Sequence, residues 1–257
     1  MKKNLLLIGL VLALSLSATA QYKGFTFGFK AGPNVGWAGS STNTAHAVGA
    51  RAGGDIGFIA EYYFTDNYAI VTGVNVSFLG GRYTFENGRM VTSGDSIPVS
   101  VFQPFQVDRT YKTTLYELPI MLKLVTNDLG AYPIRVYAQV GAGVGYNHKV
   151  LVKDGIDGGE ISETWEKTNK EFSNLRVALK IGAGVEYAID DNLRIFGGFY
   201  YSHDFVNHIN WVSPNYAGYY IDPDGEAYLD ANGDKIKRDP KLNLLHNRVG
   251  FEVGVLF

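Results

Sequence analysis

The sequence has no cysteine, no long apolar run beyond its first twenty residues, and no excess of basic charge. Without cysteine no disulfide can hold the chain, so a core, a sheet or a membrane must do so. The shortage of apolar runs argues against spanning helices, each of which needs about 20 apolar residues. A formal net charge of −2 and a pI near 6.2 argue against a nucleic-acid partner, which usually requires a basic patch. Glycine-rich phosphate loops and zinc-ligand patterns are also missing from the sequence, so no cofactor is expected.

The first twenty residues have the three parts of a secretory signal peptide. Lys2 and Lys3 supply the basic region, Leu5–Leu16 is almost wholly apolar, and Ala18-Thr19-Ala20 forms a small-x-small cleavage site. The apolar stretch is short for a spanning helix, which disfavours the alternative of a retained anchor. No cysteine follows the cleavage site, so no lipid attachment is expected there. We predict a cleaved signal peptide over residues 1–20 and one mature barrel domain over residues 21–257.

The mature sequence alternates with a period of two, which is typical of strands with one apolar face. In Ile134–Tyr146, Val136 and Val140 share one face, and Arg135 and Gln139 share the other with glycines. The mean hydropathy of −0.04 is compatible with a membrane barrel, because only every second strand residue meets lipid. The alternating segments are Gly24–Val35, Gly54–Phe64, Tyr68–Leu79, Thr113–Leu124, Ile134–Tyr146, Leu175–Ile189, Leu193–Tyr201 and Arg248–Phe257.

About eight strands of roughly 9–11 residues match the length that crosses a bilayer when tilted. The connections alternate between short and long, which predicts short periplasmic turns and long extracellular loops. Two strand-like pieces, Pro98–Val107 and Ala217–Leu229, predict either extended hairpins or a ninth and a tenth strand. The short connections are Thr65–Asn67, Thr126–Pro133 and Asp190–Asn192, and the long ones are Gly36–Ala50, Arg82–Lys112, Lys149–Ser173 and Val206–Leu244.

The strands of a soluble sandwich or lipocalin-like barrel would also alternate. The positions of the charged and aromatic residues distinguish a membrane barrel from these soluble folds. Aromatic residues lie near both ends of the strands, as in the girdles at the two membrane interfaces. We therefore predict an all-β fold: a transmembrane antiparallel up-and-down β-barrel in the cell outer membrane. The girdle residues are Tyr62, Phe64, Tyr68 and Tyr187 near the short turns, and Trp37, Phe78, Tyr146 and Tyr201 near the long loops. The charged residues of the poorer face are Lys30, Asp55, Glu61, Glu117, Lys123, Arg135, Arg176, Lys180, Glu186, Arg194, Arg248 and Glu252.

Several strands resemble a known family. Gly28–Asn34 is similar to the first strand of PorT-like outer-membrane β-barrel proteins, and Leu115–Lys123 is similar to their YxEIPxxxK strand. Gly141–Gly145 and the closing Gly250–Phe257 also fit. The resemblance covers most of the mature chain and implies a small eight-stranded barrel, of the OmpX or OmpA type, in a Gram-negative outer membrane. It implies little about activity, although some family members are linked to protein secretion.

The charges of the poorer face predict a filled lumen. The interior of an eight-stranded barrel is just wide enough for side chains, and buried charges must be paired. A paired network that closes the lumen is therefore expected, which disfavours a small-solute channel.

Ser202-His203-Asp204 contains the residue types of a catalytic triad. Adjacent strand residues point to opposite faces, so His203 cannot reach the other two side chains. We therefore predict no catalytic residue, although His203 near the rim keeps a lipid- or peptide-modifying enzyme open as the alternative.

The predicted loops contain acidic clusters and aromatic residues. Asp222–Glu226 and Asp230–Asp234 have carboxylates suited to Ca²⁺, but their Asp-Gly and Asn-Gly pairs favour turns, as in Lys153–Gly159. No metal site is predicted. The loop aromatics favour either packing within the loops or the binding of a protein or glycan partner. They are Trp165, Trp211, Tyr216, Tyr219 and Tyr220.

The expected function is that of a non-enzymatic outer-membrane barrel, structural or partner-binding, with its loops as the interaction surface. Lipids of the outer membrane are the expected contacts of the apolar face. The aromatic Phe257 resembles the terminal signal that barrel-insertion machinery reads, so that machinery is an expected partner.

Overall fold

The computed structural model describes residues 24–40, 45–93, 99–156, 165–168, 172–190, 192–208, 228–230, 232–237 and 243–257. The signal peptide predicted over residues 1–20 lies outside them. Within the described residues there is no helix with the length and apolar character needed to cross a membrane.

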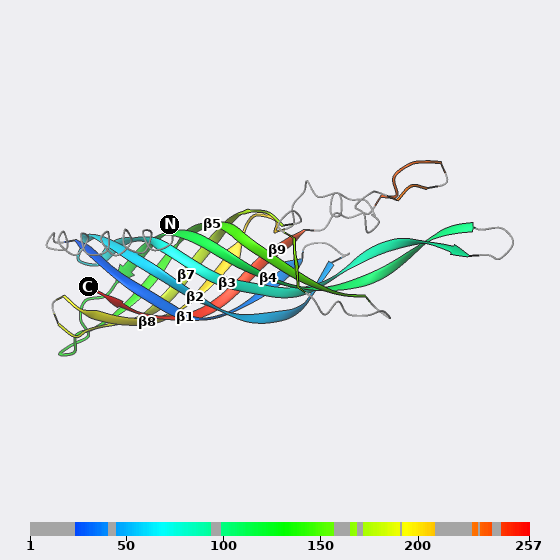
Figure 1. The fold of residues 1–257 in the computed structure, drawn as a ribbon. Coiled ribbons are helices and arrows are strands. Elements are labelled where there is room, and N and C mark those ends of the chain that lie inside the picture. Colours follow the sequence, from blue (N-terminus) through cyan, green and yellow to red (C-terminus); the bar gives the residue numbers. More distant parts are fainter. Residues whose placement is uncertain are drawn as a thin grey trace, which may run out of the picture.

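Eight antiparallel strands of the described chain close into a ring (Figure 1). Neighbouring strands pair in the order β4-β3-β2-β1-β9-β8-β7-β5, and β4 pairs with β5 to complete the circle. The short β6 adds to the outer end of β5. The strands are β1 (Phe25–Ser40), β2 (Ala45–Thr65), β3 (Tyr68–Ser93), β4 (Val99–Val125), β5 (Ile134–Ile156), β6 (Glu166–Lys167), β7 (Leu175–Ala188), β8 (Arg194–Asp204) and β9 (Leu244–Leu256). The predicted up-and-down barrel is confirmed.

The period-two pattern becomes the two sides of the barrel wall. In the part of β4 between Glu117 and Lys123, these two charged residues face the lumen and are buried. Leu118, Ile120 and Leu122 face outward and are exposed. Burial of large apolar side chains normally stabilises a soluble fold, so a continuous exposed apolar surface marks a region that something else covers. The predicted girdle residues also face outward, and Trp37 packs against Tyr201 with ring centroids 6.5 Å apart.

The two ends of the ring differ. One end, here called the turn end, carries the short connections and the C-terminal residue Phe257, whose backbone pairs with Phe27 (Figure 1). The other end is called the loop end. The predicted turn Asp190–Asn192 is confirmed in part, because Asp190 Oδ1 accepts hydrogen bonds from the backbone N–H groups of Asn192 and Leu193, both at 2.8 Å.

At the loop end the strands run much further than predicted. The segment Arg82–Lys112, predicted as a loop, is mostly strand. Of the alternatives for its strand-like piece Pro98–Val107, the extended hairpin is confirmed from Val99 onward, where the piece is part of β4 and pairs with β3. β2 pairs with β3 only as far as Phe85, and β5 pairs with β4 only from Val107. Beyond that level, residues 86–93 and 99–106 pair, within the described part of the chain, only with each other and project from the ring as an arm (Figure 1).

Two other long loops are also shorter than predicted, whereas the one predicted over Val206–Leu244 keeps its bounds, since β8 ends at Asp204 and β9 begins at Leu244. β1 and β2 take up most of Gly36–Ala50, and β5 extends to Ile156. The predicted turn Lys153–Gly159 was therefore wrong over its first four residues, which are strand. The cause is the same in each case: the alternation continues past the apolar belt, but with small and charged residues on its outer face. The strand-like piece Ala217–Leu229 lies almost entirely outside the described residues.

Candidate functional site

The centre of the lumen is held by one carboxylate that binds two cations. Glu117 of β4 accepts hydrogen bonds from Arg248 of β9 at 2.6 Å and from Lys180 of β7. Arg248 also lies 3.4 Å from Asp55 of β2, and Tyr200 donates to the same Asp55 carboxylate. Because these groups come from strands all round the ring, the network ties opposite walls together.

Two further ion-pair groups fill the lumen toward the turn end. Lys30 lies 2.8 Å from Glu252 across the β1–β9 pair. Nearer the turn end, Lys123 binds both Glu61, at 2.5 Å, and Glu186, and all three side chains are almost fully buried. An apolar cluster surrounds this second group and seals the turn end of the lumen. Its members are Ile59, Val71, Met121, Val125, Tyr137, Phe196 and Leu256, with Tyr63 packed against them.

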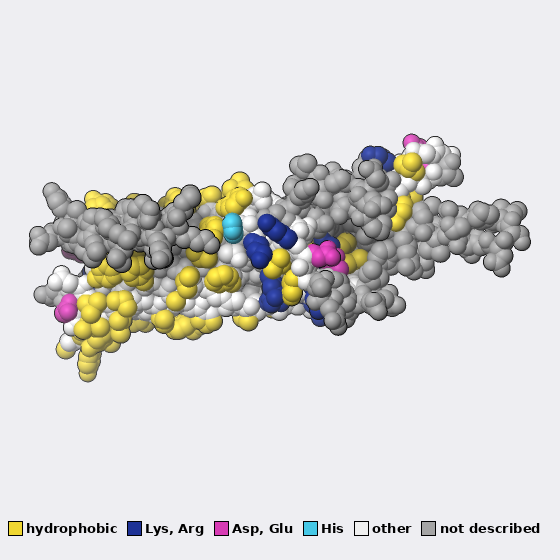
Figure 2. Space-filling model, viewed as in Figure 1, with side chains coloured by type: hydrophobic (Ala, Val, Ile, Leu, Met, Phe, Trp, Pro, Cys, Tyr) yellow, Lys and Arg dark blue, Asp and Glu magenta, His cyan; other side chains and the backbone are white. Residues whose placement is uncertain are grey.

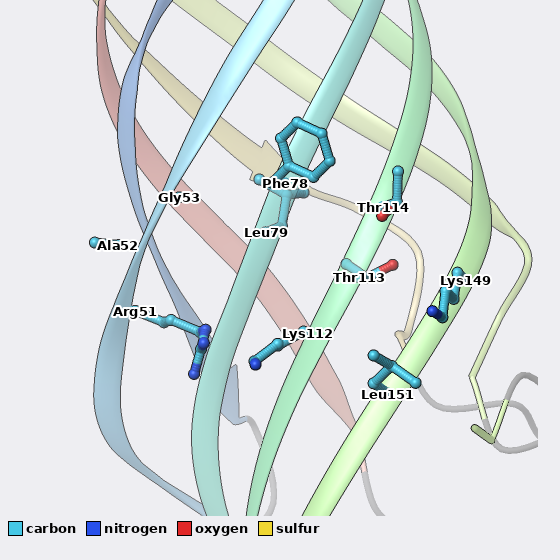
Figure 3. Close-up of a pocket in the computed structure, with 10 residues that line it drawn as sticks. All are labelled: Arg51, Ala52, Gly53, Phe78, Leu79, Lys112, Thr113, Thr114, Lys149 and Leu151. Carbon is cyan, nitrogen blue, oxygen red and sulfur yellow. The ribbon is translucent and has the colours of Figure 1, made fainter. Parts of the chain in front are cut away.

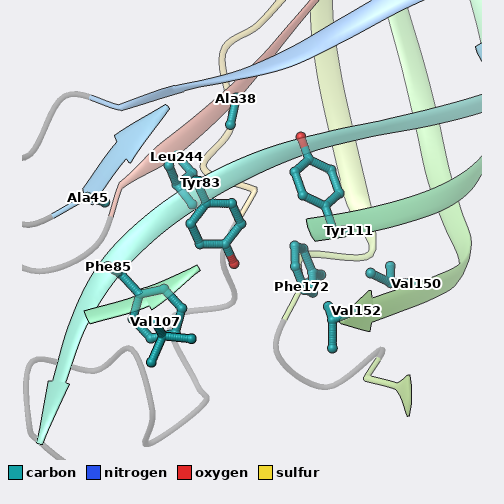
Figure 4. Close-up of a cluster of buried hydrophobic side chains, with 10 residues drawn as sticks. All are labelled: Ala38, Ala45, Tyr83, Phe85, Val107, Tyr111, Val150, Val152, Phe172 and Leu244. Carbon is teal, nitrogen blue, oxygen red and sulfur yellow. The ribbon is translucent and has the colours of Figure 1, made fainter. Parts of the chain in front are cut away.

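The loop end of the lumen is closed by a second apolar cluster, which the sequence did not predict (Figure 4). Phe172, from the segment before β7, packs among the inward side chains of this cluster and is fully buried. Its ring lies 5.7 Å from that of Tyr111, whose hydroxyl is 2.6 Å from His246 Nδ1. On the side of this cluster that faces the turn end, Arg176 pairs with Asp204. The cluster consists of Ala38, Ala45, Tyr83, Phe85, Val107, Tyr111, Val150, Val152, Phe172 and Leu244.

The predicted lumen network is confirmed, with two refinements. Arg135 lies at the exposed turn end, where its guanidinium donates to the backbone oxygens of Thr126 and Asp66 rather than to a carboxylate. Asp204, which was considered only as part of a triad, is the buried partner of Arg176. Paired charges and two apolar clusters thus occupy the described lumen from one end to the other.

The geometry around His203 agrees with the sequence argument against a triad. Ser202 and Asp204 are buried on the lumen side, whereas His203 faces outward. Its Nδ1 lies 2.6 Å from the amide oxygen of Asn247, which also accepts a hydrogen bond from Tyr201. Among the described residues, this amide is the side-chain hydrogen-bond partner of His203, so no nucleophile is paired with the imidazole.

The acidic clusters give no metal site in the described part of the chain, where no group of three or more His, Asp or Glu side chains is arranged to hold an ion. Asp230 Oδ1 instead accepts from the N–H groups of Asn232 and Asp234, both at 2.9 Å, and Gly233 has φ of 84°. This is the hydrogen bonding of a turn, as the sequence favoured. Asp222–Glu226, Trp211, Tyr216, Tyr219 and Tyr220 lie outside the described residues.

The outer wall carries a basic groove just beyond the exposed apolar belt, on the side formed by β2 to β5. Lys and Arg side chains gather beside the edge of the hydrophobic surface (Figure 2). We call the hollow between them the rim groove; its volume is about 250 Å³. Arg51 and Lys112 point toward one another across β3, and Lys149 lies on the next strand (Figure 3). The groove is lined by Arg51, Ala52, Gly53, Phe78, Leu79, Lys112, Thr113, Thr114, Lys149 and Leu151.

Two features hold the cations of the rim groove together. Gly80 leaves room for the Arg51 side chain, since a Cβ there would lie 2.4 Å from Arg51 Cδ and 2.5 Å from the Tyr111 carbonyl oxygen. The indole of Trp165 lies over both cations, with its centroid 3.6 Å from Lys112 Nζ and 5.4 Å from Arg51 Cζ. Removal from water, together with the charges of Arg51 and Lys153, lowers the pKa of Lys112 below its ordinary value.

The rim groove was not predicted from the sequence. Lys112 and Lys149 were predicted to lie in two separate long loops, Arg51 lay between a predicted loop and a predicted strand, and Trp165 was predicted as a loop aromatic. One signal was present: Lys112, Thr114 and Tyr116 continue the outward series of β4, so the cation could have been placed directly beyond the belt. The neighbouring positions of Arg51 and Lys149 follow only from the register across β3.

Comparison with known proteins places the fold. A family model described as an outer membrane protein beta-barrel domain matches residues 8–234. Among curated proteins, none matches the sequence. The chain is similar in structure to Neisserial surface protein A, at 14% identity and a TM-score of 0.40, over 90% of this chain and 95% of that one. It is similar to OprG from Pseudomonas aeruginosa at 10% identity and a TM-score of 0.34, over 91% and 97% of the chains. It is also similar to the outer membrane protease OmpT from Escherichia coli at 5% identity and a TM-score of 0.41, over 92% and 97%.

Proposed function

The chain belongs to the outer membrane protein β-barrel domain family and lies in the outer membrane, and from that premise we propose that it is a non-enzymatic scaffold with a closed lumen. Its loop end is the extracellular side and carries the binding surface. Within the family we place it with the PorT-like barrels, on the residues of Leu115–Lys123. The residues before Gln21 act as its export signal in this proposal.

The filled lumen is the observation that carries the proposal. Glu117, Arg248, Lys180 and their partners join opposite walls, and the buried side chains of Figure 4 occupy the loop end. The interior of an eight-stranded barrel is only wide enough for side chains, so we expect no aqueous path of useful width through the described lumen. A scaffold role is therefore better supported than transport.

A rim enzyme, the alternative that the sequence left open, has less support. Catalysis by His203 needs a nucleophile within hydrogen-bond reach of the imidazole. Among the described residues, the hydrogen-bond and ring-contact partners of the His203 side chain are Asn247 and Phe205, whose ring lies 5.8 Å away, and neither is a nucleophile.

Planar-bilayer recording tests the closed lumen. We expect the purified protein to insert without producing stepwise single-channel currents, because the ion pairs around Glu117 span the lumen. An open porin inserted into the same bilayer serves as the positive control. Reproducible ion-selective steps from this protein would overturn the closed-lumen proposal.

The arm tests the binding surface. Residues 86–93 and 99–106 have no strand neighbours beyond each other in the described sheet, so their outer edges can meet a partner. We expect a photo-crosslinker at Thr92 to capture a discrete partner in intact cells, whereas one at Asn192, in a periplasmic turn, captures none of that species. Equal capture from both positions would argue against an extracellular binding surface.

A further inference from the structure

We propose that the rim groove binds the phosphate group of a lipid of the outer leaflet, through Arg51, Lys112 and Lys149. This assigns a specific lipid contact to the barrel and goes beyond its role as a scaffold.

The charge of the groove is not compensated by the described protein. Among the described residues, no carboxylate lies within ion-pair distance of Arg51, Lys112 or Lys149, whereas the indole of Trp165 contacts both Arg51 and Lys112. Two other cations of these strands do have carboxylate partners: Arg82 binds Asp108, and the buried Arg109 binds Asp154 at 2.5 Å. Three neighbouring cations repel each other, so an anion that binds them all relieves that repulsion.

The position of the groove selects a lipid as the carrier of that anion. Phe78 is both a lining residue of the groove and a member of the exposed apolar belt, and Tyr116 lies two residues below Thr114 on β4. Acyl chains that cover Ile120 and its neighbours therefore place their headgroups at the level of the three cations. The groove is at the loop end, so the lipid is in the extracellular leaflet.

The side chains of the groove suit a phosphate group better than a neutral headgroup. Arg51 presents a planar fork that matches two phosphate oxygens, and the two lysines act as point charges. Thr114 adds a hydroxyl on the same outer face. The steric space at Gly80 and the indole of Trp165 hold Arg51 and Lys112 in place before the lipid arrives, which lowers the entropy lost on binding.

The described surface on the other side of the barrel serves as an internal comparison. At the same level, β1, β8 and β9 present Trp37, Tyr201, His203 and Asn247, whose side chains interact with one another through the ring contact and the two hydrogen bonds given above. The outward positions of the described strands β1, β8 and β9 hold no Lys or Arg. The proposed phosphate site is therefore confined to the β2–β5 wall.

The test measures lipid binding to the full chain in neutral detergent by native mass spectrometry, with lipid A that carries two, one or no phosphate groups as the probes. The variant Lys112→Gln/Lys149→Gln removes two groove cations from the exposed outer wall. Its matched control, Lys235→Gln/Lys237→Gln, removes the same charge from the region between β8 and β9. A third variant, Arg51→Lys, keeps the charge but removes the fork.

We expect wild type to bind the phosphorylated forms more tightly than the form without phosphate. The groove variant should weaken binding of the doubly phosphorylated form about 100-fold, at about tenfold for each charged contact. Arg51→Lys should weaken it about tenfold, and the control should leave it within about twofold. The form without phosphate should bind the groove variant and wild type alike.

Three results would overturn the proposal. One is equal affinity of wild type for lipid A with and without phosphate. Another is unchanged affinity of the groove variant while its folded gel mobility matches wild type. The third is displacement of the lipid by inorganic phosphate at equal concentration, which would assign the groove to a soluble anion. None of these results bears on the closed lumen or on the arm.

Discussion

Replacing Glu117 by Ala is expected to destabilise the barrel by about 3–5 kcal/mol, a large part of the about 5–15 kcal/mol that holds a typical domain. The reason is that Glu117 is the carboxylate shared by Arg248 and Lys180, and all three side chains are buried. Without it Lys180 has no carboxylate partner within the described lumen, and Arg248 keeps only Asp55 at 3.4 Å. The free energy of unfolding, measured by urea titration of the protein in liposomes, gives the result.

Two controls separate this effect from the loss of a side chain in general. Lys180→Met should cost less than Glu117→Ala, because Glu117 keeps its 2.6 Å contact with Arg248. Glu166→Ala removes an exposed carboxylate on β6 and should change the free energy by about 0.5 kcal/mol or less. If Glu117→Ala costs no more than Glu166→Ala, the ion pairs do not hold the ring together.

Replacing Ile120 by Arg is expected to destabilise the protein in a bilayer by about 2–4 kcal/mol. Ile120 lies in the middle of the outward apolar series of β4 and is 55% exposed in the isolated chain, so lipid covers it in the membrane. A charge there must leave water or distort the bilayer. The measurement is the same urea titration in phosphocholine liposomes.

Val48→Arg is the matched control. Val48 lies on β2 beyond the apolar belt and is exposed to a similar degree, at 51%. The cost of a charge falls to about 0–1 kcal/mol near the interface. If the two substitutions had equal and small effects, the outward apolar face would not be in contact with the hydrocarbon of the membrane.

Much of the barrel follows from the sequence because a strand repeats every two residues. In Ile134–Tyr146 the apolar positions are the outward ones in the structure, and the charged residues Glu117, Lys123 and Arg248 were correctly assigned to the lumen. A shift of one residue would place those charges in the lipid, so the pattern leaves a single acceptable register for each strand.

The ends of the strands could not be predicted in the same way. Beyond the apolar belt the outer face meets lipid headgroups and water, so Arg82, Lys112 and Lys153 replace the apolar residues and the alternation loses its contrast. The arm and the apolar cluster of Figure 4 fell within segments that were predicted as loops. Their inward residues, such as Tyr83 and Tyr111, still alternate, but a one-sided pattern of this kind is also typical of loops that pack on themselves.

The sequence by itself determined the strands within the membrane, the side that each residue faces and the charged filling of the lumen, because these depend on local periodicity. The tertiary structure decided which charges meet. Glu117 lies 131 residues from Arg248 along the chain, and their 2.6 Å contact exists only because the ring closes. The rim groove has the same origin: Arg51, Lys112 and Lys149 become neighbours through strand register and the space above Gly80.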